Sequence, residues 1–323
     1  GVEIPRGWHG STWGTIYRPL RAAFPSALYH AGKAIERVEQ DETSVTAIFA
    51  DGTREQGDLL IGADGVYSTV RRQFLPEIAP LQAGYIAWRG ILGERDLPPA
   101  AHDLLLERAA FTFPDNELVV SLPVPGADND PRPGHRRYYF IWYRPASAGE
   151  QRALFTDASG RDHGLAIPPP LIRAEFIAAM KADARRVLPT VMGEIVSRVA
   201  QPLLQSITDL EAPRMVFGRV ALLGDSAFVA RPHVAAGTSK AALDAAGLVA
   251  ALAAHAGDID AALQQYERER LAFGRAVISH ARYLGAYLEA AHLESGGTAV
   301  PRDPEQVLRE YGAPHLVREV NFD

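Results

Sequence analysis

The stretch from Arg219 to Ala251 reads RVALLGDSAFVARPHVAAGTSKAALDAAGLVAA, and it indicates how the chain folds. Its first apolar run, Val220 to Leu223, is short and unbroken, which is typical of a strand buried on both faces of a parallel sheet. Gly224 and Asp225 end that run, and an Ala- and Leu-rich helical pattern begins at Ala241. In open α/β sheets, ligands bind beyond the carboxyl ends of the strands, where a helix start offers free N–H groups. The stretch therefore predicts either a site for a polar ligand or an ordinary strand–loop–helix unit in which Asp225 only caps a turn.

The composition of the 323 residues is that of a globular protein, with 47% apolar and 22% charged residues. A net charge of −6 leaves no basic face for phosphates, so we expect no nucleic-acid partner. The chain has no cysteine, which excludes disulfides, thiolate nucleophiles and cysteine-ligated metals. Its ten histidines show no paired-ligand spacing, and we expect no metal. Neither an apolar span of about 18 residues nor a signal-peptide pattern is visible, so we expect no membrane partner and a cytoplasmic location.

A second strand-to-aspartate motif comes earlier in the chain. Asp58 to Gly65 reads DLLIGADG, in which the apolar residues 59–61 predict a short strand that runs into an Asp-Gly pair. Before it, residues 34–54 alternate in polarity and contain an Asp51-Gly52 turn, which predicts a β-hairpin.

From residue 81 to about 205 the sequence contains aromatic and β-branched segments separated by turn residues, as in an antiparallel sheet. Within it, residues 171–187 and 190–199 have helical patterns, and residues 239–255 and 259–291 predict two further helices. The predicted fold class is therefore α/β with an inserted antiparallel β-sheet domain (an α+β insert) and C-terminal helices. Residues 1–80 and 206–323 would form the α/β domain around the insert at 81–205.

Taken together, the two motifs resemble the FAD-dependent aromatic hydroxylases of the p-hydroxybenzoate hydroxylase type. The second signature of that family is an Asp-Gly pair followed by Ser and by Val-Arg, matched here by Asp64, Gly65, Ser68, Val70 and Arg71. The third signature is a strand, Gly-Asp, Pro and a Gly-rich loop that opens a helix with Asp-Ala, matched by Gly224, Asp225, Pro232, Gly237, Asp244 and Ala245. The GYIAWRG and RPHVAAGTSKA stretches, which begin at Gly84 and Arg231, are similar to the hydroxypyridine hydroxylases within the family.

The resemblance implies a Rossmann-like FAD-binding domain made of residues 1–80 and 206–323, with a substrate-binding domain at 81–205. Asp225 would accept hydrogen bonds from the ribitol hydroxyls of FAD, and the loop from Pro232 to Gly237 would lie along the flavin ring. The helix start near Thr238 would face the N1/O2 edge of that ring. Arg71 would lie near the pyrophosphate, or would be a solvated helix residue. The implied cofactor-binding set is Asp225, Gly224, Pro232, Ala236, Gly237, Thr238, Asp64, Gly65 and Arg71.

The implied reaction is hydroxylation of an electron-rich aromatic or N-heteroaromatic ring by O2 and NADH or NADPH, through a flavin hydroperoxide. The partners would be a small aromatic substrate and O2, and the helix at 259–291 would offer a face for a homodimer. Three alternatives remain open. They are a flavoprotein of the same fold that epoxidises, halogenates or oxidises, a nicotinamide-only dehydrogenase, and a non-catalytic binding protein.

Candidates for the catalytic side chains are His233, Arg89 and Tyr85. Strand alternation places Tyr85 and Arg89 on one face of the predicted strand, with Ile86 and Trp88 on the other. Arg89 would pair with an anionic or oxo group of the substrate ring, or would form a surface ion pair. His233 would orient or deprotonate a ring hydroxyl, or would be structural. The aromatic residues of segment 138–143 are expected in the sheet core rather than in a binding cage.

The chain departs from the family pattern at several positions. Ala235 and Ala236 stand where many relatives have Gly and then Gln or Gly, Ser239 stands where they have Asn, and Tyr17 stands where many have Arg. The first family signature, GxGxxG after an N-terminal strand, does not occur in these 323 residues. We therefore expect that the sequence is a fragment of a longer protein and begins after the first βαβ unit of its cofactor domain.

Overall fold

The structure is a computed structural model that describes residues 12–289 and 303–311. The chain divides into two compact units. Unit 1 contains residues 1–29, 82–207 and 286–309, and unit 2 contains residues 30–81, 208–285 and 310–323. Each unit is described below by itself. Residues 12–29, which the sequence analysis grouped with the α/β domain, are grouped here with the β-rich unit.

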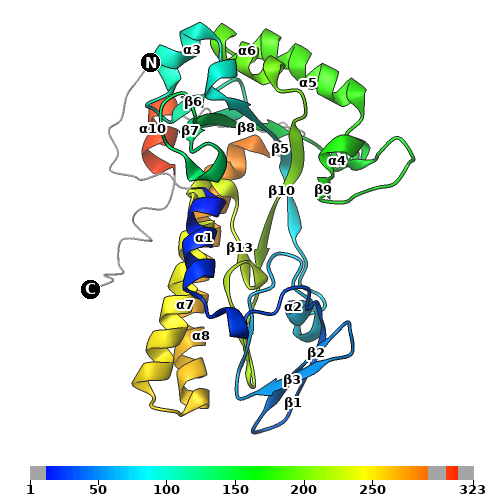
Figure 1. Ribbon diagram of the computed structural model, residues 1–323. Coiled ribbons are helices and arrows are strands. Elements are labelled where there is room, and N and C mark those ends of the chain that lie inside the picture. The colour runs from blue at the N-terminus through cyan, green and yellow to red at the C-terminus, as the bar shows by residue number, and fades with distance from the viewer. Residues whose placement is uncertain (1–11, 290–302, 312–323) are drawn as a thin grey trace. The chain divides into compact units, whose positions relative to one another are not determined.

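Unit 2 is built from short strands and two long helices (Figure 1). Its central sheet has the order β11-β12-β4, in which β12 pairs in parallel with β4 and antiparallel with β11. A separate sheet, β1-β2-β3, is an antiparallel meander. The elements are β1 (Ile35–Gln40), β2 (Val45–Phe49), β3 (Arg54–Gly57), β4 (Leu60–Gly62), α2 (Thr69–Phe74), β11 (Val216–Phe217), β12 (Val220–Leu222), β13 (Phe228–Val229), α7 (Gly237–Ala254) and α8 (Ile259–Gly285).

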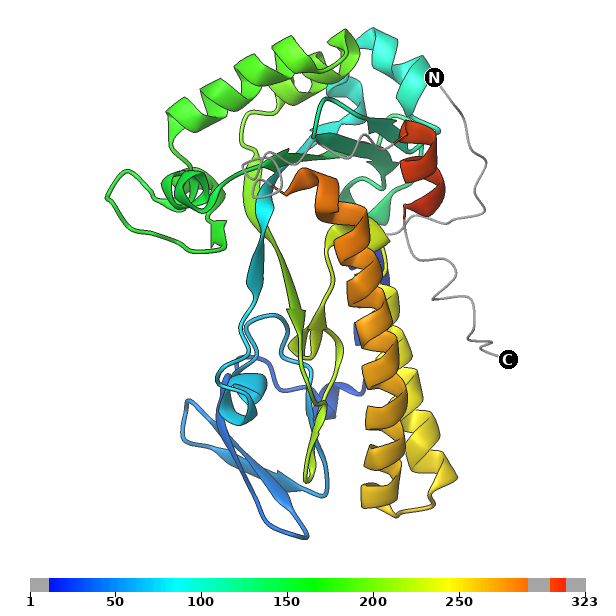
Figure 2. The same ribbon diagram turned by 180° about the vertical axis from the view of Figure 1, so that it is seen from behind.

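The core of unit 2 explains why these segments take these conformations. All three residues of β12 are fully buried, as its unbroken apolar run predicts. Helix α7 consists largely of Ala and Leu, the residues with the strongest helix propensity. It ends at a reversal in which Ala256 and Gly257 have positive φ, and α8 then runs beside it (Figure 2). Gly274 of α8 lies so close to Phe228 that a Cβ atom at residue 274 would be 2.5 Å from the phenyl ring.

Unit 1 is a sheet of antiparallel strands with helices packed on it. Its strand order is β10-β5-β8-β7-β6, and β9 also pairs with β10. Strand β10 crosses into unit 2 at residue 208, where its end pairs with β13. The elements are α1 (Trp13–Ala23), β5 (Leu81–Gly93), α3 (Pro99–Leu105), β6 (Ala110–Thr112), β7 (Leu118–Val124), β8 (Arg137–Pro145), α4 (Ala148–Phe155), β9 (Ala166–Ile167), α5 (Ala174–Val187), α6 (Thr190–Arg198), β10 (Leu203–Glu211) and α10 (Pro304–Glu310).

The alternation predicted for β5 is confirmed. Ile86 and Trp88 belong to the hydrophobic core that β8 shares with helices α5 and α6, both of which cover one face of the sheet (Figure 1). Tyr138, Phe140 and Trp142 of β8 lie fully buried in the same core. These three side chains are therefore sheet core, as expected, whereas Tyr139 and Tyr143 lie outside this cluster and contact Arg89 and Tyr85.

The main elements agree with the predicted α/β fold and its antiparallel insert, and two helix boundaries differ by three residues or more. The first helix after the prolines begins at Ala174 rather than at Leu171, because Pro169 to Leu171 form a 3-10 turn. The helix predicted for residues 259–291 ends as α-helix at Gly285, and a 3-10 turn continues it to Leu288. Residues 290 and 291 lie outside the described part of the chain.

We predict that Gly90→Ala destabilises unit 1 by about 1–3 kcal/mol, because it overpacks the core. A Cβ atom at residue 90 would lie 2.4 Å from the Phe140 ring and 2.9 Å from Val199. Gly149→Ala is the matched control, since a Cβ atom there meets no atom within 4 Å. Urea denaturation should show a lower midpoint for Gly90→Ala and an unchanged or higher midpoint for Gly149→Ala. Equal midpoints for the two variants would contradict this account of the β5–β8 packing.

Candidate functional site

The two strand-to-aspartate motifs meet at one edge of the central sheet of unit 2. Because β4 and β12 are parallel, with Leu222 opposite Gly62, their carboxyl ends lie side by side. The backbone N–H of Leu223 donates to the carbonyl of Gly62 at 3.0 Å, and the Ser226 hydroxyl also contacts that carbonyl. The loop after β4 and the 3-10 turn Gly224–Ser226 are therefore hydrogen-bonded to each other at this edge of the sheet, and together they are called the rim.

Arg71 of α2 connects the two loops of this rim. Its guanidinium donates from Nη1 to the carbonyl of Ser226 at 3.0 Å and from Nη2 to the carbonyl of Val66 at 2.7 Å. The residue is only 1% exposed, so the alternative of a solvated helix residue is wrong. Burial lowers the pKa of Arg71, and the negative charge of Asp64 opposes that change. Its Nε has no hydrogen-bond partner among the described residues.

Asp64 uses its carboxylate within the protein. It accepts hydrogen bonds from the backbone N–H groups of Thr69 at 2.7 Å and Val70 at 3.1 Å, and from the hydroxyl of Ser68. These are the free donors at the start of α2, where a negative charge is favourable. Asp64 and Arg71 thus hold the loop of the first motif in place, and contact of either with a pyrophosphate stays a prediction.

Asp225 differs from Asp64, because no described residue donates a hydrogen bond to its carboxylate. The side chain is exposed at the end of β12, directly after Gly224, whose φ of 68° requires a glycine. The protein packed around one side of the carboxyl raises the pKa of Asp225 by desolvation, while Lys240 lowers it and Asp244 raises it further. An exposed carboxylate with unused acceptors is suited to a ligand that offers hydroxyl donors.

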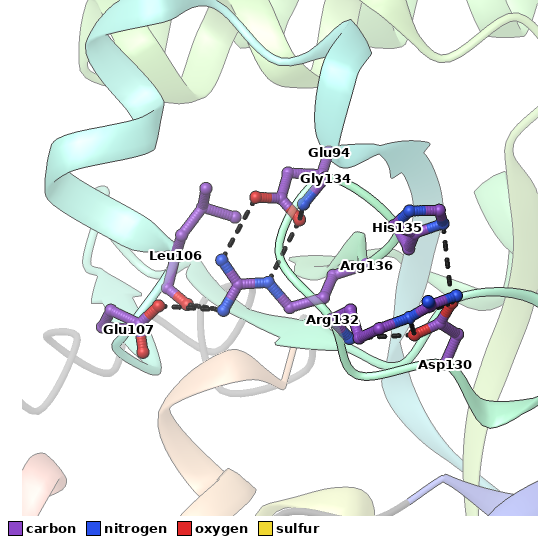
Figure 3. Close-up of polar contacts among 8 residues, drawn as sticks. All are labelled: Glu94, Leu106, Glu107, Asp130, Arg132, Gly134, His135 and Arg136. Atoms are coloured by element: carbon purple, nitrogen blue, oxygen red, sulfur yellow. Dashed lines mark hydrogen bonds and ion pairs between the residues drawn. The ribbon is translucent and has the colours of Figure 1, made fainter.

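Glu94 of unit 1 is a carboxylate that, unlike Asp225, accepts hydrogen bonds from protein donors. Glu94 accepts two hydrogen bonds from Arg136, each 3.1 Å long, and one of 2.8 Å from the N–H of Gly134 (Figure 3). Arg136 also contacts Glu107 at 2.8 Å, and its guanidinium lowers the pKa of Glu94. Both oxygens of Glu94 accept from protein donors, so this cluster fixes the loop before β8.

The loop from Arg231 to Gly237 leads into the start of α7. Ala235 adopts φ 49°, a left-handed conformation that is strained for alanine, and Ala236 precedes the helix without a side-chain cap. Gly237 and Thr238 are exposed, and a Cβ atom at Gly237 would meet no protein atom within 4 Å. The first residues of this 18-residue helix are therefore exposed at the positive end of its dipole.

Ion pairs that the sequence analysis did not identify hold this loop. Arg231 donates from Nε to Asp209 of β10 at 2.8 Å, and Arg282 of α8 contacts the other oxygen of Asp209 at 2.8 Å. Arg282 also reaches Glu211 at 3.1 Å. Arg231 and Asp209 are both buried, so the loop is fixed at its start by a network within unit 2.

His233 lies beneath the loop rather than on its surface. It is 1% exposed, and its ring meets the ring of Tyr311 edge-to-face at 6.2 Å. Its neighbours Val234 and Ala236 pack with Val277 of α8 in a small hydrophobic cluster. A role as base stays a prediction.

Tyr85 and Arg89 belong to unit 1. Tyr85 is fully buried and packs edge-to-face on Tyr143 at 6.3 Å. Arg89 forms no ion pair with a described carboxylate, so the structure does not support the alternative in which Arg89 forms a surface ion pair. Its Nε has no partner among the described residues. Burial raises the pKa of Tyr139, and the charge and hydrogen bond of Arg89 oppose that rise. Substrate contacts of both residues stay predictions.

Metal ligands and membrane-spanning helices were also sought. Within residues 12–289 and 303–311, no group of three or more His, Cys, Asp or Glu side chains is arranged to hold a metal ion. No helix in that part of the chain combines the length and apolar character needed to cross a membrane.

Comparisons with known proteins identify relatives of one kind. A family model described as FAD binding domain-like matches residues 82–209. The 2,6-dihydroxypyridine 3-monooxygenase of Paenarthrobacter nicotinovorans is 28% identical over 303 residues, which are 94% of this chain and 74% of that protein. The structure of 2,6-dihydroxypyridine-3-hydroxylase from Arthrobacter nicotinovorans matches with a TM-score of 0.81 and 27% identity, covering 93% of this chain and 72% of that one. The structure of Klebsiella pneumoniae HpxO with FAD and uric acid matches with a TM-score of 0.60 and 26% identity, covering 89% of this chain and 64% of that one.

We predict that Ala235→Gly stabilises the protein by about 0.5–1 kcal/mol, because glycine adopts the left-handed conformation of residue 235 without strain. Ala256→Gly is the matched control, since Ala256 has φ 45° in the turn between α7 and α8, away from the Arg231–Gly237 loop along the chain. Both variants should raise the denaturation midpoint by similar amounts. A lower midpoint for Ala235→Gly alone would show that contacts of its methyl group outweigh the backbone strain.

Proposed function

Because this chain is a homologue of FAD-dependent monooxygenases that act on aromatic rings, we propose that it binds FAD and hydroxylates an electron-rich aromatic or N-heteroaromatic ring with O2 and NAD(P)H. The observation that carries the proposal lies within unit 2. The exposed Asp225 carboxylate and the uncapped start of α7 follow one another on the loop that leaves β12. This combination suits a ligand with hydroxyl donors and a separate electron-rich edge.

The residues of unit 2 fit FAD in three respects. Asp225 would accept hydrogen bonds from ribitol hydroxyls, each contributing about 1.5–3 kcal/mol because the acceptor is charged. The N–H groups of Gly237 and Thr238 would face the N1/O2 edge of the flavin, and the open space at Gly237 admits a flat ring. Pro232 and Ala236 would line the ring, with Gly224 and Gly65 shaping the turns. Arg71 would support the pyrophosphate side through the loops that it joins and through its unused Nε–H.

Bound FAD would take reducing equivalents from NAD(P)H and, with O2, supply one oxygen atom to the ring, while the second oxygen leaves as water. The tasks left to this chain are to orient the ring, to hold or remove a proton from its hydroxyl and to exclude water. His233 is proposed as the proton acceptor, since a neutral imidazole is an effective base near neutral pH. Its deep burial would keep water from that position.

Arg89 is proposed to bind an anionic or oxo group of the substrate, with Tyr85 beside it on the same face of β5. The support is that no described carboxylate neutralises Arg89, so its charge is available to a ligand. We propose a hydroxylated N-heterocycle as the substrate class, because the relative found both by sequence and by structure is named for 2,6-dihydroxypyridine and another solved structure contains uric acid. A homodimer and a cytoplasmic location remain predictions.

The reaction can be tested with purified protein by following NADH and NADPH oxidation over a panel of hydroxypyridines, hydroxybenzoates and purines. We expect substrate-dependent oxidation, and mass spectrometry should find one oxygen atom from ¹⁸O2 in the product. Oxidation of NAD(P)H without oxygen incorporation would assign the chain to another flavoprotein chemistry.

We predict that Asp225→Ala weakens FAD binding by about 10–100-fold, because it removes the charged acceptor for the ribitol hydroxyls. Asp260→Ala is the control, since Asp260 is an exposed aspartate of the same unit in the first turn of α8. Visible absorbance of the isolated proteins and FAD titration measure the effect. A yellow Asp225→Ala protein with wild-type affinity would remove Asp225 from the cofactor site.

A further inference from the structure

Lys240 of α7 is fully buried, with no exposed surface. Burying an ammonium group is costly unless its charge is paired and its donors are used. The lysine lies on the first turn of α7, directly after the exposed residues 237–239 that are assigned above to the flavin edge. The mechanism proposed above gives it no role.

The contacts of Lys240 converge on the residue before Asp225. Its Nζ donates to the carbonyl oxygen of Gly224 at 3.0 Å and to Asp244 at 3.0 Å. The same oxygen of Asp244 accepts from the backbone N–H of Gly224 at 3.2 Å. Lys240 and Asp244 therefore hold both the N–H and the C=O of Gly224 from the side of α7. A Cβ atom at Gly224 would lie 3.2 Å from Ala241, so the turn also packs closely on this helix.

A second cation allows the two functions of this cluster to be separated. Arg270 of α8 donates to the other oxygen of Asp244 at 2.9 Å, but it has no contact with Gly224. Lys240 and Arg270 each pair with Asp244, and only Lys240 reaches the turn that presents Asp225. Arg270 joins Asp244 to α8, whereas Lys240 and Asp244 both belong to α7, so the Arg270 contact serves the packing of the two helices and the Lys240 contact serves the turn at Gly224.

We propose that Lys240 is a positioning residue of the cofactor site: it fixes the Gly224–Asp225 turn on α7 and holds its positive charge beside that turn, so that the Asp225 carboxylate accepts hydrogen bonds from a polyhydroxyl chain such as the ribitol of FAD. This inference rests on the proposed FAD binding for the identity of the ligand. The hold on Gly224 and the electrostatic effect on Asp225 are properties of the protein alone.

The charges around Asp225 support the electrostatic effect of Lys240 on that carboxylate. Desolvation raises the pKa of Asp225, Asp244 raises it further, and Lys240 is the group that opposes both. Other charged or titratable groups lie on the elements that pack around the Gly224–Asp225 turn. Arg71 of α2 binds the Ser226 carbonyl, and Asp64 lies in the loop of the first motif. On α8, Arg270 binds Asp244, and the Tyr266 hydroxyl binds the Leu222 carbonyl. Loss of the Lys240 charge should therefore move protonation of Asp225 to higher pH. Affinity for the ligand would then be lost at a higher pH as the solution is acidified.

The test compares Lys240→Met with Arg270→Met. Each variant removes one cation from Asp244, and only the first removes the contact with Gly224. For Lys240→Met we expect FAD affinity about ten-fold or more below wild type at pH 8, and a further loss that begins at higher pH on acidification. For Arg270→Met we expect less than about three-fold loss and an unchanged pH profile. Equal affinities and equal pH profiles in the two variants would overturn the proposal.

A cofactor-free measurement separates this proposal from the proposed function. Carboxyl ¹³C NMR titration of Asp225 and amide hydrogen exchange at residues 224–226 are made on wild type and both variants without FAD. Lys240→Met should raise the Asp225 titration midpoint and speed exchange, and Arg270→Met should do neither. If wild type binds no FAD, the proposed function fails while these readouts still decide whether Lys240 positions the turn. If Lys240→Met leaves the Asp225 titration and the exchange at residues 224–226 unchanged, the proposal for Lys240 is overturned.

Should Lys240→Met not fold, the double variant Lys240→Met/Asp244→Asn replaces it and is compared with Asp244→Asn alone, because Asp244 also binds Arg270 and the N–H of Gly224. Faster exchange at residues 224–226 in the folded double variant than in Asp244→Asn supports the proposal. Wild-type exchange there, with wild-type FAD affinity, rejects it.

Discussion

The parallel pairing of β4 with β12 is the interaction on which the site of unit 2 depends. Each strand has only three residues, and the segments are far apart in the sequence. Their pairing sets Leu222 opposite Gly62, and it therefore brings the loop of Asp64 and the turn of Asp225 to the same edge. The complete burial of β12 makes the register strict, because a shift by one residue would misplace both loops. Arg71 then joins the loops through the Val66 and Ser226 carbonyls.

Around this edge, the distribution of satisfied and unsatisfied polar groups distinguishes scaffold from site. Asp64 has both oxygens occupied by protein donors, and Asp209 binds two arginines. Each of these groups fixes a loop. Asp225 and the first N–H groups of α7 have no described partner, although the scaffold around them is densely bonded. These open groups beside a rigid scaffold are the ones that we propose for the ligand.

The sequence predicted the parts of this site that depend on local pattern. The apolar runs before Asp64 and Asp225 predicted two short strands, of which β12 is fully buried and β4 is exposed at Ile61. Alternation in β5 grouped Ile86 and Trp88 on one face, and the structure shows that this is the core face. The contacts that hold the site could not be predicted in this way, because they join residues distant in the chain. Arg71 and Lys240 are charged residues within short helical patterns, and by composition alone they would be solvated. Their burial follows only from the tertiary positions of Ser226 and Gly224.

The buried charges of unit 2 are better understood as determinants of geometry than as sources of stability. A buried ion pair gains little free energy over a well-packed apolar pair, since desolvation of both partners offsets their attraction. The Arg231–Asp209 pair and the Lys240–Asp244 pair nevertheless hold the two ends of one segment, before and after the strained Ala235. Strained backbone persists only where the surroundings fix it from several sides. Fixing both ends keeps residues 232–239 in one conformation, with the helix N–H groups and the Asp225 carboxylate already oriented. A ligand that meets an ordered loop does not have to order it on binding, and this preorganisation is what the buried charges contribute.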